Sequence, residues 1–319
     1  MPSMHAPLPV RAALFKAAPS RGDPTANFCG LPDVDPFSNR IVGGVKTVSH
    51  ELPWMVRLTK LGNFYCGGSL IADRYVVTAG HCVASYIDGA PAEPAATRGP
   101  VRNYKVLSPE KVVLEIGGYK LKKDERDVIK RPVERIILHP DYDVFLSDGV
   151  LIQRNDLALL EFQPVEFSEK ILPICLPPQD SDIRDGTIVM VSGWGSTNQE
   201  TLSNPQTSLP KVLMKTALKK IPFDDCRSNE NIEQFFKPVN GFSSLNVICL
   251  MGDDTDSCRG DSGGPGSVLT AQGHFLIAIV SWGVGCNQPD FPAVYTRISN
   301  YIEFIRSNTQ DGYFLPSIP

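Results

Sequence analysis

From Ile41 onward the chain contains short runs that are rich in β-branched and aromatic residues. Clusters of Gly, Pro, Asn and Asp separate them. The runs are FYCGGSLI (64–71), RYVVTA (74–79), KVVLEIGG (111–118), VERIIL (133–138), DLALLEF (156–162), TIVMVSGW (187–194) and FLIAIVSW (275–282). Runs of this length, bounded by turn residues, are typical of strands in an all-β barrel or sandwich. We therefore expect an all-β fold for the body of the chain.

A helical period appears only near the C-terminus. In ISNYIEFIRSN (298–308), Tyr301, Ile302 and Ile305 lie on one face of a predicted helix. Residues 1–40 carry seven of the 27 prolines without a periodic pattern, which predicts an extended leader. The expected division of the chain is a leader (1–40), a folded domain (41–308) and a C-terminal tail (309–319).

Charge and hydropathy exclude two classes of partner. The 319 residues carry a formal net charge of -4 and no block of Lys and Arg, so we expect no nucleic-acid partner. The longest clean apolar run, FLIAIV (275–280), is too short to span a bilayer. We therefore expect no membrane partner.

The eight cysteines indicate disulfide bonds. A zinc site is the alternative, but no CxxC occurs and the nearest pair is Cys249 and Cys258. Disulfides form in oxidising compartments, so we expect a secreted protein with no metal ion. Residues 1–22 lack the apolar run of a signal peptide. Secretion would then require either residues upstream of this sequence or another route of export.

The stretch CRGDSGGP (258–265) places Ser262 between glycines. Its G-D-S-G-G core also fits G-x-S-x-G, the nucleophile elbow of α/β-hydrolases, which needs an Asp and then a His downstream of the serine. The only histidine after Ser262 is His274, which lies in a strand-rich stretch. The α/β-hydrolase alternative is therefore disfavoured.

Two upstream motifs offer partners for this serine. VVTAGHC (76–82) places His81 between a glycine and a cysteine at a strand end, and RNDLALL (154–160) places Asp156 at the mouth of an apolar strand. Taken singly, such a histidine is more often structural, and such an acid is more often part of a turn. In the order His, Asp, Ser they indicate nucleophilic catalysis, in which an oriented histidine activates Ser262.

With these motifs the chain resembles the trypsin-like (chymotrypsin-fold) serine proteases. The matching motifs are IVGG (41–44), CGGSLI (66–71), TAGHC (78–82), NDLAL (155–159), GWG (193–195), CRGDSGGP (258–265), SWG (281–283) and PAVYT (292–296). CGLP (29–32) is similar to the linker of invertebrate clip-domain proteases, although no clip domain is present. The resemblance implies two packed six-stranded antiparallel β-barrels, a cleft between them and a C-terminal helix.

The resemblance also implies a role for each residue of the cleft. Ser262 would attack the scissile carbonyl, His81 would take and return the proton, and Asp156 would orient His81. The N–H groups of Gly260 and Ser262 would form the oxyanion hole. No cofactor is implied.

Substrate binding is implied at two further places. Main chain at Ser281, Trp282 and Gly283 would pair with the substrate as an added strand. Asp256, six residues before the nucleophile, would form the floor of the specificity pocket and favour Arg or Lys before the scissile bond. Ala293 stands where the family usually has glycine, which predicts lowered efficiency and altered discrimination between Arg and Lys.

Arg40 precedes IVGG, and in this family cleavage at such a bond frees an α-amino group. Here Ile41 would supply that group and Asp261 would pair with it, so the resemblance implies a zymogen that an upstream protease activates. By family pattern, the disulfides are Cys66–Cys82, Cys226–Cys249 and Cys258–Cys286. Cys29 and Cys175 remain, and a disulfide between them would tether the leader.

The segment between Cys82 and KVVLEIGG (111–118) is longer than in digestive trypsins. It is either a tolerated surface insertion or a rim that restricts the cleft. The hypothesis is a serine endopeptidase of limited proteolysis, with protein or peptide substrates, an activating protease and a serpin or other inhibitor as partners. The alternative is a catalytically weak homologue that acts as a binding or scaffold protein.

Overall fold

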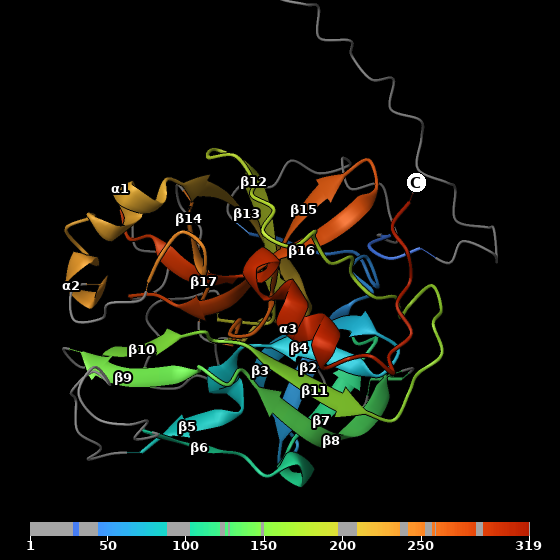
Figure 1. The fold of residues 1–319 in the computed structure, drawn as a ribbon. Helices are drawn as coiled ribbons and strands as arrows, with labels where there is room; N and C mark the ends of the chain where they lie inside the picture. The colour runs from blue at the N-terminus through green and yellow to red at the C-terminus, as the bar shows by residue number, and fades with distance from the viewer. Residues whose placement is uncertain are drawn as a thin grey trace, which may run out of the picture.

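Two β-barrels packed against each other make up the body of the protein in the computed structural model (Figure 1). The residues described are 28–31, 44–87, 103–121, 125–126, 128–147, 150–196, 209–236, 242–252, 257–258, 260–284 and 290–318. One continuous core joins the barrels, because Trp194, Leu276 and Ile279 of the second barrel pack with the buried side chains of the first.

The first barrel is closed and antiparallel, with the strand order β11-β4-β3-β2-β7-β8. Its strands are β2 (Met55–Lys60), β3 (Asn63–Ala72), β4 (Tyr75–Thr78), β7 (Val113–Ile116), β8 (Ile129–Leu138) and β11 (Ala158–Phe162). Leu61 and Gly62 join β2 to β3 with φ values of 51° and 73°. Positive φ at both turn residues gives the backbone twist that a two-residue hairpin needs.

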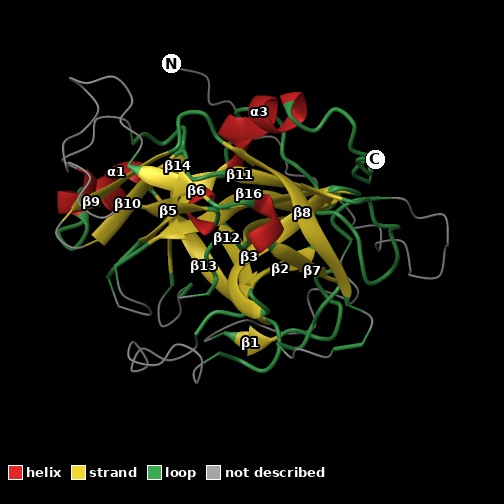
Figure 2. Cartoon of the chain, turned by 90° about the horizontal axis from the view of Figure 1, so that it is seen from below, coloured by secondary structure: helices red, strands yellow, loops and turns green. Residues whose placement is uncertain are grey.

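The second barrel follows along the chain. Its strands are β12 (Ile188–Gly193), β13 (Met214–Ile221), β14 (Val247–Met251), β15 (Pro265–Thr270), β16 (Gly273–Trp282) and β17 (Ala293–Arg297). The order β13-β12-β15-β16-β17-β14 closes on itself because β13 also pairs with β14. A short strand, β1 (Val45–Lys46), pairs with β13 outside this closure and lies at the lower edge of Figure 2.

The expected fold class is confirmed: two six-stranded antiparallel barrels and a short C-terminal helix. Each of the seven predicted runs contains a strand. The C-terminal helical segment begins as a 3-10 turn, Ile298–Tyr301, and continues as α3 (Ile302–Ser307). Ile302 and Ile305 are buried in the shared core, as the helical period predicts.

Two small hairpins lie beside the candidate site in the sequence. The first, β5 (Ala84–Tyr86) with β6 (Tyr104–Val106), follows directly after His81 and Cys82. The second, β9 (Asp143–Ser147) with β10 (Val150–Arg154), ends just before Asp156. Two short α-helices, α1 (Phe223–Arg227) and α2 (Glu233–Phe236), and two 3-10 turns, Gly80–Cys82 and Pro109–Lys111, are also described.

Residues 28–31 and the C-terminal residues meet on the body of the protein. Cys29 forms a disulfide with Cys175, and its N–H donates to Pro316 O at 2.9 Å. Gly30 N–H donates to Pro173 O, and His274 N–H donates to Gly30 O, each at 2.8 Å. The described part of the leader is therefore held by main chain as well as by the disulfide.

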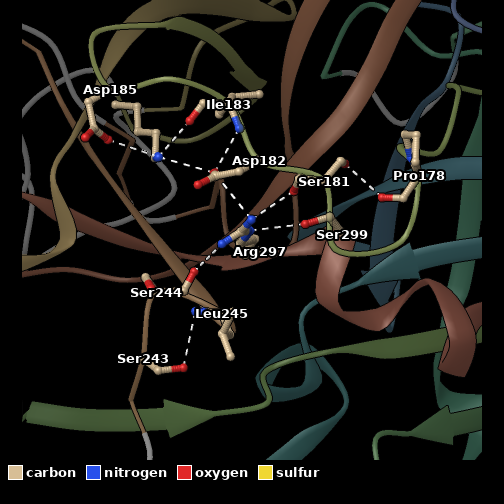
Figure 3. A network of polar contacts seen from close by, with 11 residues as sticks. Pro178, Ser181, Asp182, Ile183, Asp185, Ser243, Ser244, Leu245, Arg297 and Ser299 are labelled. Carbon is tan, nitrogen blue, oxygen red and sulfur yellow. Dashed lines mark hydrogen bonds and ion pairs between the residues drawn. The ribbon is translucent and has the colours of Figure 1, made fainter.

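Arg297, at the end of β17, binds the segment around Ser181 that leads into the second barrel (Figure 3). The guanidinium, whose side chain is 10% exposed, donates to Ser181 O at 2.9 Å and to Ser244 O. It also donates to Ser299 Oγ at 3.1 Å and lies 3.4 Å from Asp182. One cation thus joins three separate stretches of main chain.

Removing this cation should destabilise the fold. In Arg297→Met, Ser181 O and Ser244 O lose a charged donor in a partly buried place, so the free energy of unfolding should fall by about 1–3 kcal/mol. Denaturant unfolding of the oxidised Ser262→Ala protein measures it. Arg227→Met is the control, because that guanidinium is 60% exposed and pairs with exposed Asp224; the expected change is within about 0.5 kcal/mol. Equal losses in both variants would contradict the assignment.

Candidate active site

Strand pairing in the first barrel brings His81 and Asp156 together. Ala158, at the start of β11, pairs with Thr78, at the end of β4. His81 follows Thr78 in a 3-10 turn (Gly80–Cys82), and Asp156 precedes Ala158. Because antiparallel partners lie opposite each other, the ends of the two strands place both side chains at the same rim of the barrel.

The carboxylate of Asp156 is 2% exposed and accepts hydrogen bonds on both oxygens. His81 N–H donates to Oδ1 at 2.8 Å, and His81 Nδ1 lies 2.8 Å from Oδ2. Ser281 Oγ, from β16 of the second barrel, donates to Oδ2 at 2.6 Å. With Nδ1 engaged in this way, the imidazole is held in one orientation and Nε2 remains for proton exchange.

The environment shifts the pKa of both groups. Burial alone would raise the pKa of Asp156, but the charge of His81 and the hydrogen bonds from His81 and Ser281 outweigh it and lower that pKa. Burial alone would lower the pKa of His81, but the charge and hydrogen bond of Asp156 raise it. The pair therefore favours an ionised Asp156 beside a more basic imidazole.

Ser262 lies on a loop that is packed against the first barrel. Its carbonyl accepts a hydrogen bond from Gly67 N–H at 2.8 Å. Gly263 has φ 77°, and a Cβ there would lie 2.2 Å from Thr78 Oγ1, so only glycine fits. The loop thus comes against the end of β4, three residues before His81.

The side chain of Asp261 contacts the GWG segment. Its Oδ1 accepts from Gly195 N–H at 2.7 Å, and its Oδ2 accepts from Cys258 N–H at 3.0 Å. A Cβ on Gly195 would lie 2.4 Å from the carboxyl carbon, so the absence of a side chain there admits the aspartate. Burial raises the pKa of Asp261 to about 6, although the two amides lower it.

The residues expected to bind substrate lie at the ends of β16 and β17. Ser281 and Trp282 end β16 and are buried, whereas Gly283 is exposed. Ala293 begins β17 and is buried, and its methyl group faces Gly283: a Cβ built on Gly283 would be 3.6 Å away. Nearby, the hydroxyls of Ser257 and Tyr295 hydrogen bond at 2.8 Å.

Three disulfides join the same partners as in the expected pairing: Cys66–Cys82, Cys226–Cys249 and Cys29–Cys175. Cys258 is also disulfide-bonded. The other expected residues, Arg40, Ile41, Asp256 and Cys286, lie outside the described residues. Within the described ranges, the one cluster of three possible metal ligands is Cys66, His81 and Cys82, and its two sulfurs already form a disulfide.

Two hydroxyl contacts were not anticipated from the sequence. Ser281 was expected to act through its main chain, but its side chain also binds Asp156 Oδ2. Thr296 Oγ1 donates to Asp156 O at 2.9 Å. Ser281 lies in the motif SWG and Thr296 lies in PAVYT. Alternation along a strand predicts the face of the sheet on which each side chain lies, but it does not predict which residue that side chain contacts.

Comparison with known proteins agrees with this geometry. The profile of the family described as Trypsin matches residues 41–305. The chain belongs to the trypsin family. It is 34% identical to Melanization protease 1 of Drosophila melanogaster over 303 residues, which is 90% of this chain and 69% of that protein. It is 30% identical to Serine proteinase stubble of Drosophila melanogaster over 290 residues, which is 87% of this chain and 32% of that protein.

This trypsin-family chain is accordingly a serine endopeptidase, with proteins as its class of substrate. Among the described residues, no helix is both long enough and apolar enough to cross a bilayer. The chain spans about a third of the stubble protein.

The pKa of Asp261 gives a prediction for the uncut protease. A folded pKa of about 6, above the ordinary value of 3.8, means that the folded chain binds more protons than the unfolded chain between these pH values. Stability should therefore fall as pH rises through this window. Asp261→Asn removes the titration, so between pH 4 and pH 7 its free energy of unfolding should improve relative to the parent by about 1–3 kcal/mol.

Denaturant unfolding at several pH values, in the uncut Ser262→Ala background, measures this difference. Parallel pH profiles for the two proteins would contradict the assigned ionisation of Asp261.

Proposed function

We propose that this protease is a zymogen, activated by cleavage between Arg40 and Ile41, that hydrolyses peptide bonds after Arg or Lys. The observation that carries the proposal is the buried Asp156 carboxylate, which accepts from His81 twice while the Ser262 loop packs against the same strand end. A buried acid holding one histidine by both ring and main chain serves to orient that histidine.

The chemistry follows from this arrangement. Ser262 Oγ attacks the scissile carbonyl as its proton passes to His81 Nε2, and the carbonyl π electrons move to the oxygen. The N–H groups of Gly260 and Ser262 stabilise that oxyanion. His81 then gives its proton to the leaving amine as the C–N bond breaks, which leaves an acyl-enzyme. Water, deprotonated by His81, releases the acyl group by the reverse sequence.

The charge of Asp156 stabilises His81 in the middle of this reaction, when His81 is an imidazolium. The raised pKa of His81 favours that intermediate. It also means that activity is lost as pH falls through the raised pKa, because protonated His81 cannot act as a base.

Activation would act on Asp261. In the uncut chain this carboxyl is buried with two amide donors and a pKa of about 6. The α-amino group freed at Ile41 would supply a full positive charge, complete the pair and fix the adjoining Gly260 and Ser262. The free energy of this ion pair is available only after cleavage, so a single cut would switch the protease on.

Specificity would come from Asp256 and its surroundings. A carboxylate at the floor of a pocket binds a cationic side chain, and Ser257, the next residue in the chain, has a hydroxyl that hydrogen bonds with that of Tyr295. The methyl group of Ala293 faces Gly283, and in such a pocket it would narrow the space for the substrate side chain. This narrowing also supports the alternative function, a weakly catalytic homologue that acts by binding.

The proposal also covers the division of the chain, its secretion and its partners. We place the leader at 1–40, the protease domain at 41–308 and the tail at 309–319, and expect secretion because disulfides join the described parts. The name of Melanization protease 1 places that relative in melanization. Limited proteolysis in a cascade, with an activating protease and a serpin or other inhibitor, is the corresponding proposal for this chain.

The test uses purified zymogen cut after Arg40, with the new N-terminus read as IVGG. The cut protein should hydrolyse fluorogenic peptides that have Arg or Lys before the scissile bond, and not those with Phe or Leu. Asp156→Asn should lower kcat by about 10⁴-fold, because it holds the wrong tautomer of His81, and Ser262→Ala is the matched inactive control. Equal activity in the Ser262→Ala protein, or none in the cut parent, would refute the proposal.

Ala293→Gly should raise kcat/KM. Removing the methyl group widens the pocket for a long cationic side chain, and we expect an increase of about 3- to 30-fold, since a single methylene in a pocket has effects of about 10- to 200-fold. The ratio of the Arg to the Lys substrate should change as well. Gly283→Ala, which adds a methyl group on the opposite side, should act in the reverse direction. Unchanged kinetics in Ala293→Gly would exclude a role for this methyl group in the pocket.

A further inference from the structure

A buried cation lies at the junction of the two barrels. Arg57, in the middle of β2, has a side chain that is 1% exposed. Its Nε lies 3.0 Å from Glu115 Oε2, and its Nη1 lies 3.2 Å from Glu125 Oε2 and also donates to Lys120 O. A charge this deep is stable only with such partners, so its position is defined by three groups.

The same guanidinium supports the GWG segment. Arg57 Cζ lies 5.5 Å from the centre of the Trp194 ring, within the range of a cation–π contact. The indole is fully buried, and its Nε1–H donates to Tyr119 O at 3.0 Å. Tyr119 is itself fixed, because its N–H donates to both Glu125 oxygens at 3.0 and 3.1 Å. Arg57 and its acid partner therefore hold the indole ring and its acceptor.

From Trp194 the contacts lead directly to the nucleophile loop. The next residue, Gly195, donates its N–H to Asp261 Oδ1 at 2.7 Å. A Cβ built on Gly260 would lie 3.1 Å from Gly195 Cα, so these two backbones are in close contact. A shift of the indole would therefore move the support beneath Gly260 and Asp261, the two residues that precede Ser262.

We propose that Arg57 is a positioning residue for peptide hydrolysis: by holding Trp194, it keeps Gly195 against Gly260 and Asp261 and so keeps the oxyanion hole formed. This inference rests on the proposed function. Arg57 touches no substrate, and its contribution is to the geometry that the transition state needs. Its loss should therefore lower kcat while KM changes little.

Two variants separate positioning from folding. Arg57→Lys keeps a positive charge but loses the planar fork that contacts two acids and an aromatic ring. The triple variant Arg57→Met, Glu115→Gln, Glu125→Gln removes the cation together with its acids, so no unpaired charge is left inside. Arg135→Met is the matched control, since Arg135 pairs with Glu161 while its own side chain is 56% exposed.

The kinetic measurement uses the cut enzymes and an Arg peptide substrate. We expect kcat to fall about 10- to 100-fold in the triple variant and less in Arg57→Lys, with KM within about threefold, because a donor is displaced rather than removed. A peptidyl arginine aldehyde, which Ser262 Oγ converts to a hemiacetal whose oxyanion occupies the hole, should bind more weakly by the same factor. Benzamidine, which fills only the cationic pocket, should bind as before.

Unchanged kcat in the folded triple variant would overturn the proposal. So would parallel losses of aldehyde and benzamidine affinity, because these would indicate damage to the whole cleft. Hydrogen exchange of the peptide containing Gly195 gives a reading that needs no catalysis: its amide should exchange faster in the uncut triple variant than in Arg135→Met. An inactive cut parent would refute the proposed function, and equal exchange in the two variants would still separately refute this role of Arg57.

Discussion

An ionised carboxylate that is almost wholly removed from water needs several donors around it, and at Asp156 these donors come from both barrels. His81 approaches from the end of β4 and Ser281 from β16, while Thr296 of β17 binds the main-chain oxygen of the same residue. The two barrels can therefore satisfy Asp156 only in one relative placement. That placement is also the one in which the Ser262 loop packs against the first barrel.

Other buried charged groups also lie along the junction of the two barrels. Asp261 is satisfied by amides of the second barrel, and Arg57 of the first barrel lies against Trp194 of the second. Glu51 and Lys215 form a further buried ion pair beside β1. Ion pairs of this kind add little net stability compared with apolar packing, but removing one partner is costly. Such pairs specify how the barrels meet, while the apolar core supplies most of the energy of folding.

Sequence reasoning reached the fold because its strands depend on local patterns. Runs rich in β-branched and aromatic residues predicted β3, β4, β7, β8, β11, β12 and β16, and the motifs around His81, Asp156 and Ser262 carried the prediction of the site. The strand β13, Met214–Ile221, was missed because its lysines leave no run rich in β-branched and aromatic residues; one of them, Lys215, is buried with Glu51. The contacts of Arg57 and Ser281 were also beyond the sequence, since they join residues that only the packing of two barrels brings together.

The joining of Cys29 to Pro316 and Cys175 has a practical consequence for how this protein is produced. A recombinant fragment limited to residues 41–308 would retain Cys175 without its disulfide partner. It would also lose Leu315, which packs with Cys29 and Cys175 in one small cluster. The newly exposed thiol and apolar surface would favour disulfide-linked dimers and aggregation during oxidative refolding. Cys29 and the C-terminal residues Leu315 and Pro316 thus shield Cys175 together.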